Sequence, residues 1–260
     1  VRIAHLRIHG LQCSLKEDKD GHWVLQGLPS RDDHSIEPEQ LLRSMQMFKR
    51  LSLLDSQVTM QPFGRAPLNL ECVGLTLDNG SKDQRFDVRM NFPDGDPLVI
   101  SLRSRICANE LKDAEVQAYL SLPQIDWAKW IPANLTHKWK IKQFKAGGEF
   151  WLNWSKGAIQ RAVVRLNSPQ IKGSYAERKT VHIENLSLTA YLQRSGTSLK
   201  VLFDSLAMNI GDKRWESRLQ LQQLFSTDKE LEIWKMHADI FDLTPITPLL
   251  NALVPLPDRK

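Results

Sequence analysis

Histidine, cysteine and acidic side chains are the residues through which this chain could bind a metal ion or perform nucleophilic catalysis. His5 and His9 are the closest pair of histidines, but they fall in a strand-like stretch, where four residues span about 13 Å. That separation is too large for both rings to reach one metal ion. The three cysteines lie far apart, at Cys13, Cys72 and Cys107, and form no Cys-x-x-Cys pair. We therefore predict no metal site and no cofactor.

Motifs that mark enzyme active sites are missing from the sequence. It contains no Gly-x-Ser-x-Gly elbow, no Gly-x-Gly-x-x-Gly loop, no phosphate-binding lysine loop and no His-Glu-x-x-His pair. Two acidic turns, around Gly21 and Gly95, lack the later glutamate that completes a calcium loop. The sequence therefore offers no candidate catalytic residues.

Tryptophan is the residue type whose placement suggests binding. Five of the eight tryptophans fall between positions 127 and 154, namely Trp127, Trp130, Trp139, Trp151 and Trp154. We expect most of them to pack in the core or on a sheet face, because each buries a large apolar area. Stacking on a sugar and contact with acyl chains remain alternative interpretations.

The composition is that of a folded soluble protein. The chain has 260 residues, of which 42% are hydrophobic and 25% charged, a length that suits one large or two ordinary domains. The net charge of +5 is spread along the chain, and the lysines near position 140 alternate with apolar residues instead of forming a basic block. We predict no nucleic-acid partner.

The sequence contains no candidate transmembrane helix. Its longest uncharged stretch, residues 243–257, includes four prolines and is shorter than the roughly 18 apolar residues that a spanning helix needs. Val1 falls within a strand-like pattern and is not preceded by a leader sequence, so we expect the chain to be an internal segment of a longer protein.

Apolar and polar residues alternate with a period of two along most of the chain, which predicts an antiparallel sheet with one apolar face. Turn residues such as Asp78-Asn79-Gly80, Gly147-Gly148 and Ser195-Gly196 separate the runs and predict a meander of roughly twelve to fifteen strands. The apolar positions of the clearest runs are the candidate site residues, namely Phe86, Val88, Met90, Leu98, Ile100, Leu102, Phe150, Leu152, Trp154, Leu186, Leu188, Val201 and Phe203.

Local breaks in this alternation predict bends and a tandem organisation. Four stretches, residues 8–11, 72–75, 183–186 and 203–206, each shift the apolar pattern by one position, which predicts β-bulges and curved strands. Asp126 and Asp242 each follow a strand-like run, and we expect each to cap a short helix. We therefore predict two units, residues 1–134 and 135–260.

One helix is predicted, over residues 38–50. Leu41, Met45 and Phe48 recur at helical spacing, and acidic residues near the start and basic residues near the end match the helix dipole. We expect this helix to pack on the sheet, or alternatively to cover an apolar groove.

One predicted helix and two short capped helices cannot cover roughly twelve to fifteen strands. The apolar faces of the strands must therefore either close on each other or remain open. We predict a mainly β fold, a long twisted antiparallel sheet curled into an open apolar groove of the β-taco type, with the amphipathic helix and short capping helices. The candidate residues would line this groove and bind acyl chains, since each buried methylene contributes about 0.8 kcal/mol. A closed β scaffold for protein interaction and a carbohydrate-binding module around Trp154 are the alternatives.

Several segments in collinear order resemble the bacterial AsmA-like proteins. They are residues 21–29, the predicted helix leading into 54–60, then 125–135, 148–157, 181–190 and 239–250. The resemblance implies a non-enzymatic segment of a periplasmic protein of Gram-negative bacteria, anchored in the inner membrane by an N-terminal helix absent from this chain. It further implies that phospholipid moves between the inner and outer membranes, with its acyl chains in the groove, as in bridge-like lipid transfer proteins.

Overall fold

The computed structural model describes most of the chain. The described residues are 3–19, 23–26, 47–64, 67–80, 83–92, 96–105, 114–129, 131, 139–175, 180–196, 198–225, 232–239, 242, 244–247 and 249.

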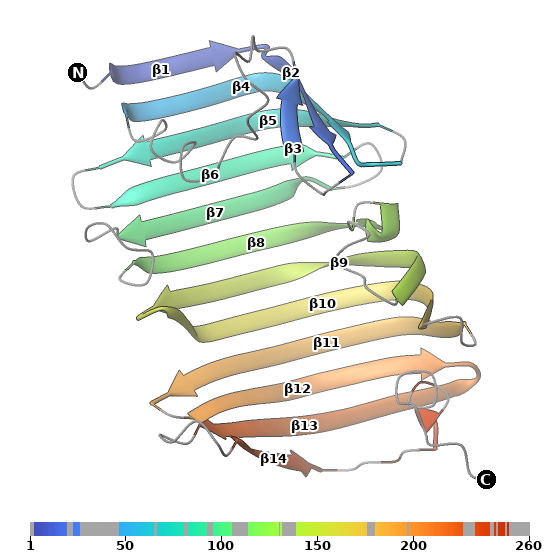
Figure 1. Ribbon diagram of the computed structural model, residues 1–260. Coiled ribbons are helices and arrows are strands. Elements are labelled where there is room, and N and C mark those ends of the chain that lie inside the picture. Colours follow the sequence, from blue (N-terminus) through green and yellow to red (C-terminus); the bar gives the residue numbers. More distant parts are fainter. Residues whose placement is uncertain are drawn as a thin grey trace. The chain divides into compact units, whose positions relative to one another are not determined.

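Fourteen strands and one short 3-10 helix make up the described elements (Figure 1). The strands are β1 (Ile3–His9), β2 (Gln12–Glu17), β3 (Trp23–Gln26), β4 (Phe48–Gln61), β5 (Leu68–Asn79), β6 (Gln84–Asn91), β7 (Leu98–Arg105), β8 (Glu115–Asp126), β9 (Trp139–Ser155), β10 (Ala158–Tyr175), β11 (Val181–Ser195), β12 (Ser198–Ile210), β13 (Lys213–Phe225) and β14 (Glu232–Ala238). The 3-10 helix, η2, is Trp127–Lys129. The fold is therefore mainly β, as the alternating pattern predicts.

The strands belong to one mostly antiparallel sheet of 14 strands, in which neighbours from β4 to β14 follow chain order. The chain divides into two compact units: unit 1 is Val1–Pro123 with Ser155–Gly157, and unit 2 is Gln124–Trp154 with Ala158–Lys260. The predicted boundary between residues 134 and 135 lies outside the described residues and stays a prediction.

Cross-strand pairing brings the apolar residues of unit 1 together on one face. One row consists of Leu6, Leu51, Leu77, Phe86 and Leu102, and the next of Ile8, Leu53, Leu75, Val88 and Ile100. The alternate residues project from the other face, where Arg50 and Asp78 form an ion pair of 3.3 Å. Because paired residues of neighbouring strands point to the same side, the period-two pattern becomes two chemically different faces.

Two strand pairs in unit 1 depart from the predicted antiparallel arrangement. Both β1 and β2 pair with β4 in parallel. Parallel pairing requires a long connection, and residues 27–47 between β3 and β4 provide one. The offset between partners is the same on both sides of Gly10: His9 pairs with Leu54, and Gln12 with Gln57.

Unit 2 repeats the two-faced arrangement and adds a buried cluster. Its apolar rows include Leu166, Leu188 and Leu206; Ala190, Phe203 and Leu219; and Leu192, Val201 and Leu221. Towards the end of β12, the buried side chains of Met208, Ile210 and Trp215 pack around Ile246 from the C-terminal part of the chain. This buried cluster therefore forms where a segment outside the sheet covers the apolar face.

The four predicted bulge positions are irregular in the structure, as the pattern breaks indicate. Gly10 and Asn185 have left-handed backbone, with φ of 66° and 51°. Register shifts occur between Cys72 and Gly74, between Glu184 and Ser187, and between Phe203 and Leu206. Asp55 also has left-handed backbone (φ 50°), which no break in the alternation indicates; it lies in β4 one residue after the partner of His9.

The helix predicted over residues 38–50 is wrong at its C-terminal end. Phe48 and Arg50 belong to β4, where Phe48 pairs with Ile3, and Arg50 with both His5 and Asp78. Pairing on both sides of β4 overrides the helical spacing, as tertiary context often does. Residues 38–46 lie outside the described residues.

The turn predicted at Gly147-Gly148 is also wrong, because both glycines lie inside β9. A Cβ atom at Gly147 would lie 2.9 Å from the backbone of Gln124, and one at Gly148 would overlap the carbonyl oxygen of Arg165. The glycines therefore permit close approach of neighbouring backbones within a continuous strand.

We expect Gly148→Ala to lower the free energy of unfolding by about 1–3 kcal/mol, because the added methyl group collides with backbone that cannot move aside easily. Urea denaturation followed by circular dichroism measures this difference. Gly74→Ala is the matched control, since its Cβ would meet only Leu54 at 3.9 Å, an ordinary contact. Equal destabilisation by both substitutions would contradict the close-approach explanation.

Candidate functional site

The six candidate residues of unit 1 form three cross-strand pairs on its apolar face. Phe86 pairs with Leu102, Val88 with Ile100, and Met90 with Leu98. Val88 and Leu98 are buried and the other four are partly buried. All described strands belong to one sheet.

The opposite face of the same strands is polar. Arg85 and Asp87 form an ion pair of 2.6 Å, and the Ser101 hydroxyl donates a hydrogen bond to the Asp87 carboxylate, also at 2.6 Å. A second ion pair, of 3.1 Å, joins Arg105 and Asp83. These exposed pairs contribute little stability individually, but they mark the side of unit 1 that is compatible with water.

In unit 2 the structure brings four more candidates to the apolar face. Leu188 pairs with Leu206, Val201 with Leu192, and Phe203 with Ala190. The fourth, Leu186, packs against the buried cluster around Ile246. These residues therefore share a surface, and Leu186 lies where the C-terminal segment covers it.

Trp151 shows on which face of β9 its neighbouring candidates, Phe150, Leu152 and Trp154, project. The Arg165 guanidinium lies over the Trp151 ring at 5.3 Å from its centroid, so these two side chains share a face of the sheet. Arg165 is flanked on β10 by Val164 and Leu166, which pair with Ala190 and Leu188 on the apolar face. Side chains alternate along a strand, so Phe150, Leu152 and Trp154 project on that apolar face, opposite to Trp151.

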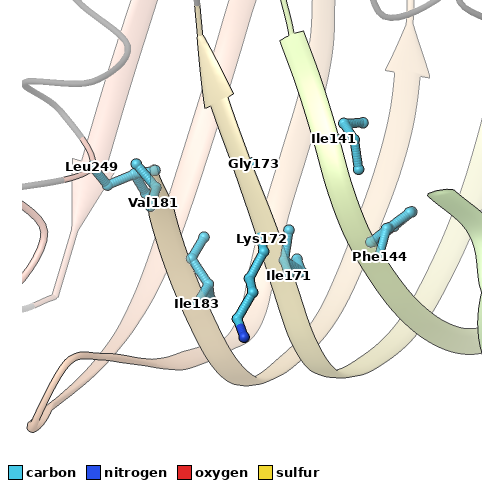
Figure 2. A pocket seen from close by; sticks show the side chains of 8 residues that line it. All are labelled: Ile141, Phe144, Ile171, Lys172, Gly173, Val181, Ile183 and Leu249. Atoms are coloured by element: carbon cyan, nitrogen blue, oxygen red, sulfur yellow. The ribbon is translucent and has the colours of Figure 1, made fainter. Parts of the chain in front are cut away.

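An apolar pocket of about 300 Å³ lies on three neighbouring strands of unit 2 (Figure 2). Its lining consists of Ile141 and Phe144 from β9, Ile171, Lys172 and Gly173 from β10, Val181 and Ile183 from β11, and Leu249 from the C-terminal segment. Lys172 is the charged residue of this lining.

None of the thirteen candidate residues lines this pocket. Sequence reasoning missed its residues because the strand ends that carry them show only short alternation, as in Val181-His182-Ile183. The pairing of Ile171 with Ile183, which brings two such ends together, follows only from the register of β10 and β11.

The predicted capping role of Asp126 is confirmed, and it also ties β8 to the pocket wall. One carboxylate oxygen, Oδ1, accepts hydrogen bonds from the backbone N–H of Ala128 at 3.1 Å and of Phe144 at 2.9 Å. The Trp127 indole N–H donates to the Ala146 carbonyl oxygen at 2.7 Å. These bonds hold the turn after β8 against β9, beside the pocket residue Phe144.

The predicted cap at Asp242 is confirmed as well: a turn over residues 244–246 follows it, and Thr247 and Leu249 are helical. The Thr244 backbone N–H donates to Asp242 Oδ1 at 2.9 Å. That bond, the Thr244 hydroxyl and the charge of Lys213 lower the pKa of Asp242. The carboxylate therefore stays charged at neutral pH, and its contribution to stability is lost as the pH falls through the lowered pKa.

Groups that could bind a metal ion are not gathered anywhere in the described part of the chain. Cys13 is free, and partial burial raises the pKa of its thiol. The raised pKa makes the thiol a weak nucleophile, because less of it is present as thiolate. In the same described residues, none of the helices has the length and hydrophobicity that crossing a bilayer requires.

Comparison with protein families identifies the chain. A family model described as YhdP protein matches residues 1–258. The chain belongs to the YhdP family. This match confirms the predicted family resemblance, and proteins of the YhdP family are bacterial envelope proteins. No curated protein and no solved structure matches the chain.

We expect Asp126→Ala to lower the free energy of unfolding by about 1–3 kcal/mol, because two backbone N–H groups lose their acceptor. Asp126→Asn keeps an oxygen at the same position and should cost less. Urea denaturation gives the free energies, and hydrogen exchange at the Phe144 amide reports the lost bond directly. Unchanged protection of Phe144 in the alanine variant would contradict this role of Asp126.

Proposed function

We propose that the apolar faces of the two units bind the acyl chains of phospholipids and leave the headgroups in water. The observation that carries this proposal is the set of cross-strand apolar rows that run across the strands of each unit. In unit 1 the opposite face is polar. Side chains such as Phe86, Val88 and Phe203 would line the binding surface, an open groove along the sheet.

The pocket in unit 2 supports an acyl ligand over a sugar. Its lining consists mainly of aliphatic side chains and Phe144, without the polar groups that a sugar's hydroxyls require. Each methylene that such a surface removes from water contributes about 0.8 kcal/mol, so a chain of several methylenes binds with useful affinity. Lys172 adds one positive charge to the rim, and a charge of that sign suits a lipid phosphate.

Membership of the YhdP family supports the wider role. We propose that the chain is a non-enzymatic, periplasmic part of an envelope protein anchored in the inner membrane of a Gram-negative bacterium. It would carry phospholipid between the inner and outer membranes, with the acyl chains moving along the apolar faces. An apolar face without side chains placed for catalysis fits a path for lipid better than a reaction centre.

We expect the chain, purified from a Gram-negative host and examined by native mass spectrometry, to carry co-bound phospholipid. Phe86→Asp and Phe203→Asp should each reduce the number of bound phospholipids per chain. The double variant should reduce total occupancy roughly tenfold, because an unpaired carboxylate next to an acyl chain is strongly unfavourable.

The matched controls place the same charge on the polar faces. Gln117→Asp is exposed on β8 opposite Arg103, and Gln220→Asp is exposed on β13 opposite Leu202. Both controls should bind as much phospholipid as the unmodified chain. If the unmodified chain carries no phospholipid, the proposed function is wrong. If both phenylalanine variants bind normally, these residues do not line the path.

A further inference from the structure

The C-terminal turn, defined as Asp242, residues 244–247 and Leu249, covers one end of the apolar face of unit 2. Ile246 is only 6% exposed and packs against Met208, Ile210 and Trp215. Leu249 packs against the same cluster and also forms part of the pocket lining, where Figure 2 shows it beside Val181. The turn therefore lies at the boundary between the buried cluster and the open pocket.

Polar and apolar contacts hold this turn in place. One polar attachment to the sheet is the hydrogen bond from the Trp215 indole N–H to the Asp242 carbonyl oxygen, at 2.9 Å. Its own shape depends on the bond from the Thr244 N–H to the Asp242 carboxylate. Asp242 and Thr244 are exposed, Pro245 is buried, and Ile246 and Leu249 pack against the apolar cluster.

The surface under the turn is chemically the same as the surface beside it. Ile210 pairs with Ile183, and Ile183 pairs in turn with Ile171, so one row runs from beneath Ile246 into the pocket. An acyl chain extending along this row would meet Leu249 and Ile246. The acyl chain and these two side chains cannot occupy the same apolar surface at once.

We infer that the C-terminal turn is an internal plug whose apolar side chains occupy the place of an acyl chain at this end of unit 2. The inference rests on the proposed function. Phospholipid fills the full row only in molecules whose turn has moved away, so the stability of the turn sets the apparent affinity of this part of the path. Loosening the turn raises the binding-competent fraction and strengthens lipid binding there.

The test uses the full chain with the photoreactive residue p-benzoylphenylalanine at one of two positions, Phe144 in the pocket or Phe86 on the apolar face of unit 1. Each protein is incubated with vesicles of phosphatidylethanolamine and phosphatidylglycerol, irradiated, and analysed for crosslinked phospholipid. The double variant Ile246→Ala with Leu249→Ala should increase crosslinking at position 144 about threefold or more, with no change at position 86.

Two further variants separate the plug from general loss of structure. Asp242→Ala loosens the turn without altering the apolar lining, and it should increase crosslinking at position 144 in the same way. Ile233→Ala removes the same side chain from an exposed position on the polar face of β14 and should have no effect.

The outcomes distinguish this inference from the proposed function. In one outcome, phospholipid crosslinks at both positions, but neither turn variant increases the crosslinking at position 144. That result overturns the plug and leaves the proposed function intact. Absence of crosslinked phospholipid at both positions in every protein overturns both. A selective increase at position 144 in both turn variants, and not with Ile233→Ala, supports the plug.

Discussion

Cross-strand pairing of the backbone is the constraint on which the rest of this structure depends. Paired residues of neighbouring strands must point to the same side, so the register of each ladder decides which side chains meet. In unit 1 this register aligns Leu77, Phe86 and Leu102 into one row and leaves Asp78, Arg85 and Arg103 on the other side. A one-residue slip of β6 would place Arg85, Asp87 and Arg89 in the apolar rows.

The bends in the strands are compatible with this constraint because they occur at residues that tolerate unusual backbone. Asn185 has left-handed backbone at the bulge in β11, and asparagine accepts that conformation more readily than most residues. Asp204 lies in the bulge of β12 and forms an ion pair of 2.7 Å with Arg218 of the neighbouring strand. Each strand can therefore change direction while the apolar rows on either side of the bend remain continuous.

The apolar faces must be kept from water, and in unit 2 part of the cover comes from the chain itself. In unit 2, Ile246 and Leu249 supply apolar cover from within the chain, and burying a side chain such as Ile246 contributes about 1.5–3 kcal/mol. The pocket beside them is open and bordered by Leu249. A surface that accepts the chain's own isoleucine and leucine is chemically suited to hydrocarbon, which is why the proposed ligand and the proposed plug involve the same residues.

The sequence alone determined the features that depend on neighbouring residues: the period-two faces, the bulges, and the capping roles of Asp126 and Asp242, whose carboxylates accept from N–H groups two residues ahead. Tertiary structure decided features whose cause lies far along the chain. Phe48 and Arg50 follow a helical pattern, yet strands on both sides of β4 supply ladder partners that a helix could not use. Gly147 and Gly148 resemble a turn, but both lie within β9. The backbones of Gln124 and Arg165 come so close to them that no side chain would fit. The pocket likewise exists only because the register joins Ile171 to Ile183, and no local pattern specifies which strand ends will meet.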